Sequence, residues 1–122
     1  MGWSVVFDDA FDGEFQTYPD DVQDEILALA QLLERFGPGL KRPHCDTLNG
    51  SRHANMKELR CNAGGGAWRV AFAFDPERKA ILLVGGDKTG GSQKQFYRTL
   101  IRTADERFNA HLSTLKRGKG GR

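Results

Sequence analysis

Apolar residues recur along the chain with two different periods, and these periods predict its helices and strands. Residues 3–7 form a short β-prone run, and a short helical pattern follows at 10–15. Pro19 then opens a longer helix, in which apolar residues recur every three or four positions until a glycine and a proline end it. The stripe of this helix consists of Val22, Ile26, Leu29, Ala30, Leu33 and Phe36.

The second half of the chain is predicted to be mainly β-structure. Segments 56–61 and 67–74 are expected as strands joined by a glycine-rich turn, because large apolar residues of the second alternate with smaller or charged ones. The continuous apolar run at 80–84 is typical of a strand buried on both faces. Segment 38–55 is interpreted as a long loop before these strands, and 85–91 as a glycine-rich loop after them.

A final amphipathic helix completes the predicted domain. Ser92, with Gln95 three residues later, is a typical helix start, and apolar residues then recur at helical spacing to Leu115. The predicted order is β-α-α-β-β-β-α, an α+β domain with helices packed on a small, mainly antiparallel sheet. One domain is expected over residues 1–115, followed by a basic, disordered tail at 116–122.

Composition narrows the classes of protein to which this chain can belong. Its 122 residues, 39% of them hydrophobic, suit one globular domain. With no apolar run long enough to span a membrane and no secretory signal at its start, a cytoplasmic protein without a membrane partner is expected. The cysteines, Cys45 and Cys61, and the histidines lack the short spacing of structural zinc sites. No metal, cofactor or disulfide framework is therefore expected.

The net charge of +2 conceals a strong division of charge along the chain. Residues 1–36 carry nine acidic residues and one basic residue, whereas residues 37–122 carry seven acidic and 17 basic residues. The acidic part is mainly the predicted helical hairpin, which is a candidate surface for a partner protein. Leu27 and Leu32 lie off the apolar stripe of this hairpin, and they either contact such a partner or extend the core.

The basic part contains one strand with an unusual polar face. Along 67–74, Arg69 is followed at alternating positions by Ala71 and Ala73, opposite a face of large apolar residues. The two small side chains are expected to leave a shallow depression in the sheet, with the arginine at its end.

Three further cations are expected to converge on this depression. Lys57 and Arg60 come from the preceding strand, and Lys88 comes from the glycine-rich loop. Such a cluster suits the phosphates of a nucleic acid, and a lysine among cations is expected to have a lowered pKa. That lysine can serve as a general base, while arginines stabilise the charge on a phosphorane without a metal. The alternative is a set of solvated charges with Glu58 and Asp87 as partners.

Six short motifs follow one another in the second half of the chain. They are M-K-E-L-R at 56–60, W-R-V-A-F at 68–72, A-I-L-L-V at 80–84, G-D-K-T at 86–89, Q-F-Y-R at 95–98, and Ala104 and Asp105 with Arg107. In this order they resemble the RelE/HigB toxins, and more narrowly the phage Gp49-like branch of the RelE/ParE superfamily. The resemblance covers roughly residues 3–115, and the order of the motifs, rather than any one of them, makes it specific.

The resemblance implies the toxin of a bacterial type II toxin–antitoxin pair. Such toxins enter the decoding site of the 30S ribosomal subunit and cut mRNA there. The ribose 2′-hydroxyl attacks the adjacent phosphate, which leaves a cyclic phosphate and a 5′-hydroxyl without a metal or cofactor. The implied partner is a small helix-turn-helix antitoxin, and the toxin would reach operator DNA only through it.

The same resemblance implies roles for the basic residues. Arg60 and Arg69 match two strand arginines, and Arg69 would contact the phosphate or stabilise the transition state. Lys88 matches a basic residue that acts as a general acid or contacts phosphate, where some HigB members have a histidine. Lys57 is a candidate general base. The division of acid and base roles among Lys57, Lys88 and His53 stays open.

Three residues are candidates for RNA contacts beside the reacting phosphate. Tyr97 would stack on a base, as a C-terminal aromatic of the family does, or else it packs beside Phe96. Arg98 follows it on the last helix, and His53 lies in the long loop.

Two other functions stay open for the same fold. One is a ParE-like toxin that grips DNA gyrase without catalysing a reaction, and the basic cluster argues against it. The other is an inactive module that binds RNA or regulates its operon.

Overall fold

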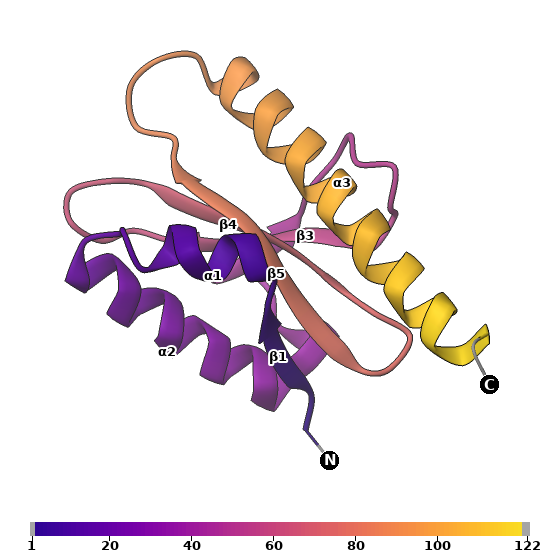
Figure 1. The fold of residues 1–122 in the computed structure, drawn as a ribbon. Helices are drawn as coiled ribbons and strands as arrows, with labels where there is room; N and C mark the ends of the chain where they lie inside the picture. Colours follow the sequence, from indigo (N-terminus) through magenta and orange to yellow (C-terminus); the bar gives the residue numbers. More distant parts are fainter. Residues whose placement is uncertain (1, 121–122) are drawn as a thin grey trace.

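Five strands form one mixed sheet with helices on both faces (Figure 1). The structure, a computed structural model, describes residues 2–120 and the side chains of residues 2–118. The strands are β1 (Ser4–Phe7), β2 (Cys45–Thr47), β3 (Met56–Cys61), β4 (Trp68–Phe74) and β5 (Lys79–Asp87). The helices are α1 (Asp9–Phe15), α2 (Asp20–Phe36), the 3₁₀ turn η1 (Gly37–Gly39) and α3 (Gln93–Gly120). The α+β fold expected from the sequence is confirmed.

The sheet has the strand order β1-β5-β4-β3-β2. β1 runs parallel to β5, and every other neighbouring pair is antiparallel. β2 lies within the segment that was expected to be a long loop, and it pairs with β3 at one edge of the sheet. Three residues are too few to show an alternating pattern, so the sequence gives no sign of this strand.

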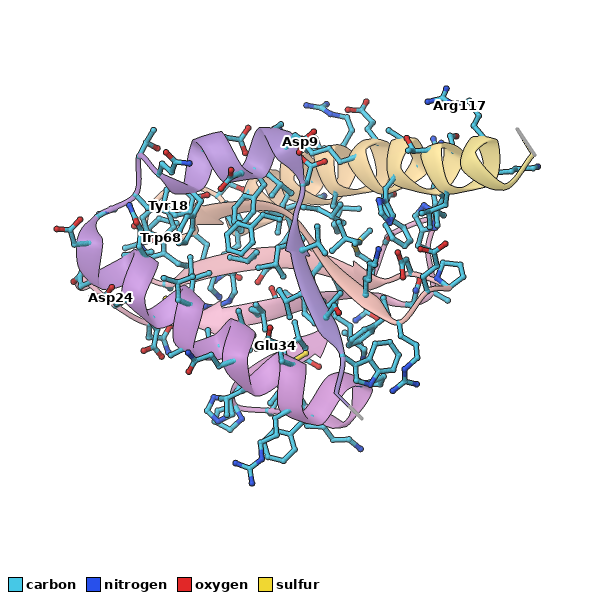
Figure 2. All side chains as sticks on the ribbon, turned by 60° about the horizontal axis from the view of Figure 1, so that its bottom comes forward. Asp9, Tyr18, Asp24, Glu34, Trp68 and Arg117 are labelled. Atoms are coloured by element: carbon cyan, nitrogen blue, oxygen red, sulfur yellow. The ribbon has the colours of Figure 1, made fainter. Side chains whose placement is uncertain are left out.

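The helical hairpin of α1 and α2 covers one face of the sheet. The stripe predicted for α2 is buried there, except for Phe36, which is exposed. Just before α2, Tyr18 lies against Trp68 of β4, with ring centroids 4.5 Å apart (Figure 2). Of the two leucines off the stripe, Leu27 is exposed and Leu32 packs against this core.

The division of charge along the chain is also a division in space. The exposed side of the hairpin carries acids, among them Asp9 and Asp24, whereas Arg117 lies at the far end of α3 (Figure 2). The acidic hairpin and α3 cover opposite faces of the sheet.

Helix α3 covers the other face and fills the depression expected beside Arg69. Ala71 and Ala73 are fully buried, and they share a core with Leu100 and Phe108 of α3. The expectation of an open depression is therefore wrong. The small side chains give the apolar stripe of α3 a surface on which it packs closely.

Two glycines expected in the loop after the last strand belong to β5 instead. A Cβ at Gly85 would lie 2.9 Å from Tyr18 Oη and 3.2 Å from the main-chain oxygen of Arg69, and a Cβ at Gly86 would lie 3.0 Å from the Phe96 ring. The glycines thus allow side chains from both helical layers to approach β5, and the loop itself begins at Lys88.

Helix α3 begins where the sequence indicates and extends further than expected. Ser92 Oγ accepts a hydrogen bond from the main-chain nitrogen of Gln95 at 3.2 Å, which caps the helix. The helix continues to Gly120, through most of the segment expected to be a disordered tail, and residues 121–122 lie outside the described residues. Lys116 and Arg117 favour this extension, because cations interact well with a helix C-terminus. Within residues 2–120, no helix has the length and apolar character needed to cross a membrane.

Candidate functional site

Three of the four predicted catalytic cations form one cluster. Arg60 of β3 and Arg69 of β4 are register partners, so both side chains leave the sheet on the face toward α3. Arg69 is 3% exposed, and Arg60 is half-buried. Lys88 joins them directly after β5, where burial, followed by the charges of Arg69 and Arg60, lowers its pKa from the ordinary lysine value. The direction agrees with the lowered lysine pKa expected from the sequence, although burial rather than the neighbouring cations is its largest cause.

The fourth cation, Lys57, lies on the opposite face. Side chains alternate along a strand, so Lys57 shares its face with Leu59 and Cys61, which are buried in the core beneath α2. There it lines a separate cleft of about 450 Å³ with residues from 38–47. Contrary to expectation, Lys57 does not join the cluster, because an odd number of positions separates it from Arg60.

A buried carboxylate, Glu58, stands at the centre of the cluster. It is 5% exposed and lies on the same face of β3 as Arg60. Its Oε2 accepts a hydrogen bond from Arg60 Nη1 at 3.0 Å, and its Oε1 accepts one from Tyr97 Oη at 2.9 Å. Arg69 Nε lies 3.9 Å from Oε1, near enough for charge attraction but too far for a hydrogen bond. The sequence offered Glu58 only as an ion-pair partner of solvated cations; its pairing with Arg60 is observed, but Glu58 is buried rather than solvated.

Arg69 carries a buried hydrogen-bond donor without a partner. Its Nη1 donates to the main-chain oxygen of Trp68 at 2.9 Å and to Asn62 Oδ1 at 3.5 Å. Its Nε has no hydrogen-bond partner among the described residues. An unmet buried donor costs about 1–3 kcal/mol, so this position lowers the stability of the fold unless another group meets the donor.

The G-D-K-T segment holds the backbone of Lys88 in place. Asp87 Oδ1 accepts hydrogen bonds from the main-chain nitrogens of Ala67 at 3.1 Å and Thr89 at 2.9 Å, and the nitrogen of Lys88 donates to the oxygen of Ala67 at 2.9 Å. Hydrogen bonds from Thr89 are the main cause of a lowered pKa at Asp87. Asp87 therefore fixes the backbone of the loop through hydrogen bonds and does not pair with the cations of the cluster.

Tyr97 belongs to the cluster through its hydroxyl. Its ring packs edge-on against Phe96, with centroids 5.2 Å apart, while its hydroxyl donates to Glu58. Burial, and then the hydrogen bond to Glu58, raise the pKa of the phenol, so Tyr97 stays protonated as a donor. Of the two alternatives from the sequence, packing beside Phe96 is observed, and the ring is half-buried.

The other two candidates for RNA contacts lie outside the cluster. Arg98 is exposed and lines a separate cleft along α3. His53 bonds through Nε2 to Asn109 Oδ1 at 2.8 Å. Since Asn109 follows Tyr97 by twelve residues of α3, His53 sits about 18 Å further along the helix. At this distance His53 is too far from the cluster to act there as a general acid or base.

The cluster combines the groups that phosphate chemistry requires. A carboxylate can accept a proton, an ammonium with a lowered pKa can give one, and two guanidinium groups can hold an anion. Among residues 2–118, no group of three histidine, cysteine or carboxylate side chains is placed to share a metal ion. The carboxylate, the ammonium and the guanidinium groups together suit acid–base chemistry on a phosphodiester.

Comparisons with known proteins point to one family. Residues 13–109 match the family described as phage derived protein Gp49-like. The proposed toxin HigB3 of Mycobacterium tuberculosis (strain H37Rv) is 47% identical over 94 residues, which cover 77% of this chain and 80% of HigB3. The proposed toxin HigB2 of the same strain is 47% identical over 89 residues; these cover 72% of this chain but 44% of HigB2.

A solved structure supports the same grouping at the level of the fold. The E. coli toxin RelE in the free state, in a form with two arginines replaced by alanine, superposes with a TM-score of 0.61. The superposition covers 83% of this chain and 95% of RelE at 11% sequence identity. The chain therefore belongs to the Gp49-like family and has the fold of the RelE/HigB toxins.

Proposed function

We propose that this chain is the toxin of a toxin–antitoxin pair and that it cuts mRNA on the ribosome. The observation that carries the proposal is the buried Glu58, bonded to Arg60 and Tyr97 and flanked by Arg69 and Lys88. The relatives named HigB2 and HigB3 support the toxin assignment. The site of action would be the cytoplasm, where ribosomes translate mRNA.

In the proposed reaction, a ribose 2′-oxygen attacks the adjacent phosphorus while Glu58 accepts its proton. The new bond joins phosphorus to O2′, and the bond between phosphorus and O5′ breaks. Lys88 gives a proton to the departing O5′, and its lowered pKa makes it a stronger acid near neutral pH. The products are a 2′,3′-cyclic phosphate and a 5′-hydroxyl. Glu58 takes the base role that the sequence suggested for Lys57, which lies on the other face.

The two arginines would hold the phosphate during this step. Arg60, which is half-buried, would donate to a non-bridging oxygen, and the buried guanidinium of Arg69 adds positive charge behind it. Charge on the phosphorane is greater than on the ground-state phosphate, so these donors favour the transition state. Tyr97 is a positioning residue, because its hydroxyl fixes one oxygen of Glu58.

The first test compares two lysines on opposite faces of the sheet. Lys88→Gln removes the proposed acid, and Lys57→Gln makes the same chemical change outside the cluster. Cleavage of mRNA on purified ribosomes by Lys88→Gln protein should fall by about 10²–10⁴ relative to wild type. Lys57→Gln protein should cut at the wild-type rate, and primer extension maps the new 5′ ends for each protein.

Some outcomes of this experiment, and of induction of the protein in cells, would contradict the proposal. Equal loss in both lysine variants would mean that the sheet face does not define the site. Growth arrest without discrete new 5′ ends, accompanied by DNA damage, would indicate a gyrase-directed toxin. Steep salt-dependent RNA binding without growth arrest would indicate an inactive RNA-binding or operon-regulating module.

The proposed partner is a helix-turn-helix antitoxin that also carries the pair to operator DNA. A toxin is tolerated by its host only while its antitoxin is present, so co-expression of a cognate antitoxin should restore growth. Growth arrest that no neighbouring helix-turn-helix reading frame relieves would contradict this part of the proposal.

A further inference from the structure

A second cationic cleft lies along α3, outside the Glu58 cluster. It has a volume of about 440 Å³ and lies between the loop at 48–55 and the first half of α3. Arg52 lines it from the loop, and Arg98 and Arg102 line it from the helix. The two helical arginines are four residues apart, so their backbones lie about 6 Å apart along the axis.

The loop that carries Arg52 is fixed against the helix. Asp105 of α3 is 7% exposed, and it accepts hydrogen bonds from Ser51 Oγ and from the main-chain nitrogen of Arg52, the latter at 3.0 Å. His53 adds its bond to Asn109, one turn further along α3. Because these anchors are contacts within the chain, binding would not have to order the loop.

Positive charge is in excess in the cleft, and none of its arginines is tied up in a salt bridge among the described residues. Among residues 2–118, Arg52 and Arg102 take part in no salt bridge, and Arg98 only donates to Gln95 Oε1 at 3.4 Å. Two acids, Asp105 and Glu106, also line the cleft, and Asp105 is bonded only to neutral donors of the loop, so three arginines leave an excess of one positive charge.

We propose that this cleft binds phosphates of single-stranded RNA, as a second anion site beside the Glu58 cluster. Guanidinium groups bind phosphate through paired hydrogen bonds, and three of them suit successive phosphates of a backbone. Arg98 directly follows Tyr97, so a strand at Glu58 can continue along α3 into the cleft. The path of that strand rests on the proposed function, whereas the binding of RNA by the cleft does not.

The test measures RNA binding without cleavage. A fluorescent single-stranded 2′-O-methyl RNA lacks the attacking hydroxyl, so its affinity for the full chain is independent of nuclease activity. The double substitution Arg52→Ala with Arg102→Ala should raise Kd at least about tenfold. It should also reduce the slope of log affinity against log salt by about 1.4, since each phosphate contact on a single strand contributes about 0.7.

A matched control removes the same kind of charge from the opposite face. Arg35→Ala, on an exposed position of α2, should leave both Kd and salt slope unchanged. Arg102→Gln serves as a milder second variant, because it keeps most of the side-chain length at an exposed position.

The proposal is overturned if the cleft variants bind the RNA like wild type with an unchanged salt slope. It is also overturned if they lose affinity for a polyglutamate peptide but not for RNA, which would assign the cleft to an acidic protein. Competition by millimolar inorganic phosphate alone would assign it to free phosphate. Normal RNA binding by the cleft together with absent cleavage would overturn the proposed function and leave this inference standing.

Discussion

Lys88 owes its chemistry to the residues around it. Burial and the charges of Arg69 and Arg60 all disfavour its protonated form, and Glu58 opposes them. Its pKa is therefore lower than that of an ordinary lysine, and the proton it gives to a leaving oxygen is held less tightly. As the proposed general acid, it must be protonated to act, so cleavage should decline as pH rises through its pKa.

Arg60→Gln should move this alkaline decline to higher pH. Removing a neighbouring positive charge favours the protonated form of Lys88, so its pKa rises toward the ordinary value. The pH–rate profile of mRNA cleavage on ribosomes measures the shift. Arg42→Gln, an exposed arginine outside the cluster, is the matched control and should leave the profile in place. A decline that stays put or moves to lower pH in Arg60→Gln protein contradicts the acid role of Lys88.

The sequence predicts most of the residues of the site, but it predicts less well on which face of the sheet each one lies. Arg60, Arg69 and Lys88 are identified from strand patterns and from the family resemblance, and the structure brings them together. Lys57 and Glu58 are adjacent in β3, and strand alternation sends one away from the cluster and the other into its centre. A shift of β3 by one residue would exchange the faces of Lys57 and Glu58. The register that prevents such a shift is set by pairing with the neighbouring strands.

At the scale of elements, β5 is the strand that both helical layers contact. Its central residues are buried on both faces, as the continuous apolar run predicts. Gly85 meets Tyr18 from the hairpin side, and Gly86 meets Phe96 from α3. Sequence patterns place these glycines in a loop, because a glycine needed for close approach looks the same as one needed for a turn.

Gly85→Ala should therefore destabilise the fold by about 1–3 kcal/mol. The added Cβ would lie 2.9 Å from Tyr18 Oη and 3.2 Å from a main-chain oxygen, which cannot move away easily. Urea unfolding measures the change. Gly13→Ala is the control: it lies in α1 with no atom within 4 Å of the added carbon, and it should stabilise by about 0.5–1 kcal/mol through helix propensity. Equal stability of wild-type and Gly85→Ala proteins would contradict the close approach.

At the scale of the whole molecule, Arg107 joins the two helical layers. From α3, its Nη1 and Nη2 donate to both oxygens of Glu14 in α1, at 2.9 and 2.7 Å. Nη1 also donates to the main-chain oxygen of Leu83 in β5 at 2.8 Å. The hydrogen bonds to Glu14 are the leading cause of a raised pKa at Arg107. One guanidinium thus links three elements that lie far apart in the chain.

Arg107→Lys tests whether this geometry or the charge alone stabilises the fold. A lysine keeps the charge but not the planar fork, so the free energy of unfolding should fall by about 1–2 kcal/mol. Arg102→Lys, at an exposed position five residues earlier on α3, should change the free energy of unfolding by less than about 0.5 kcal/mol. The two variants are compared by urea unfolding. A full retention of stability in Arg107→Lys protein would show that the fork is dispensable.

Helix α3 covers the core that contains Ala71 and Ala73, and its Tyr97 hydroxyl holds Glu58. Its Asp105 also anchors the loop of Arg52. Undocking of this one helix would therefore expose the core, release the carboxylate and free the loop in a single event. A cellular protease that cleaves the chain when α3 is undocked would therefore inactivate the protein with its first cut. Degradation of the protein and loss of its activity would then occur in the same step, and no active fragment would accumulate.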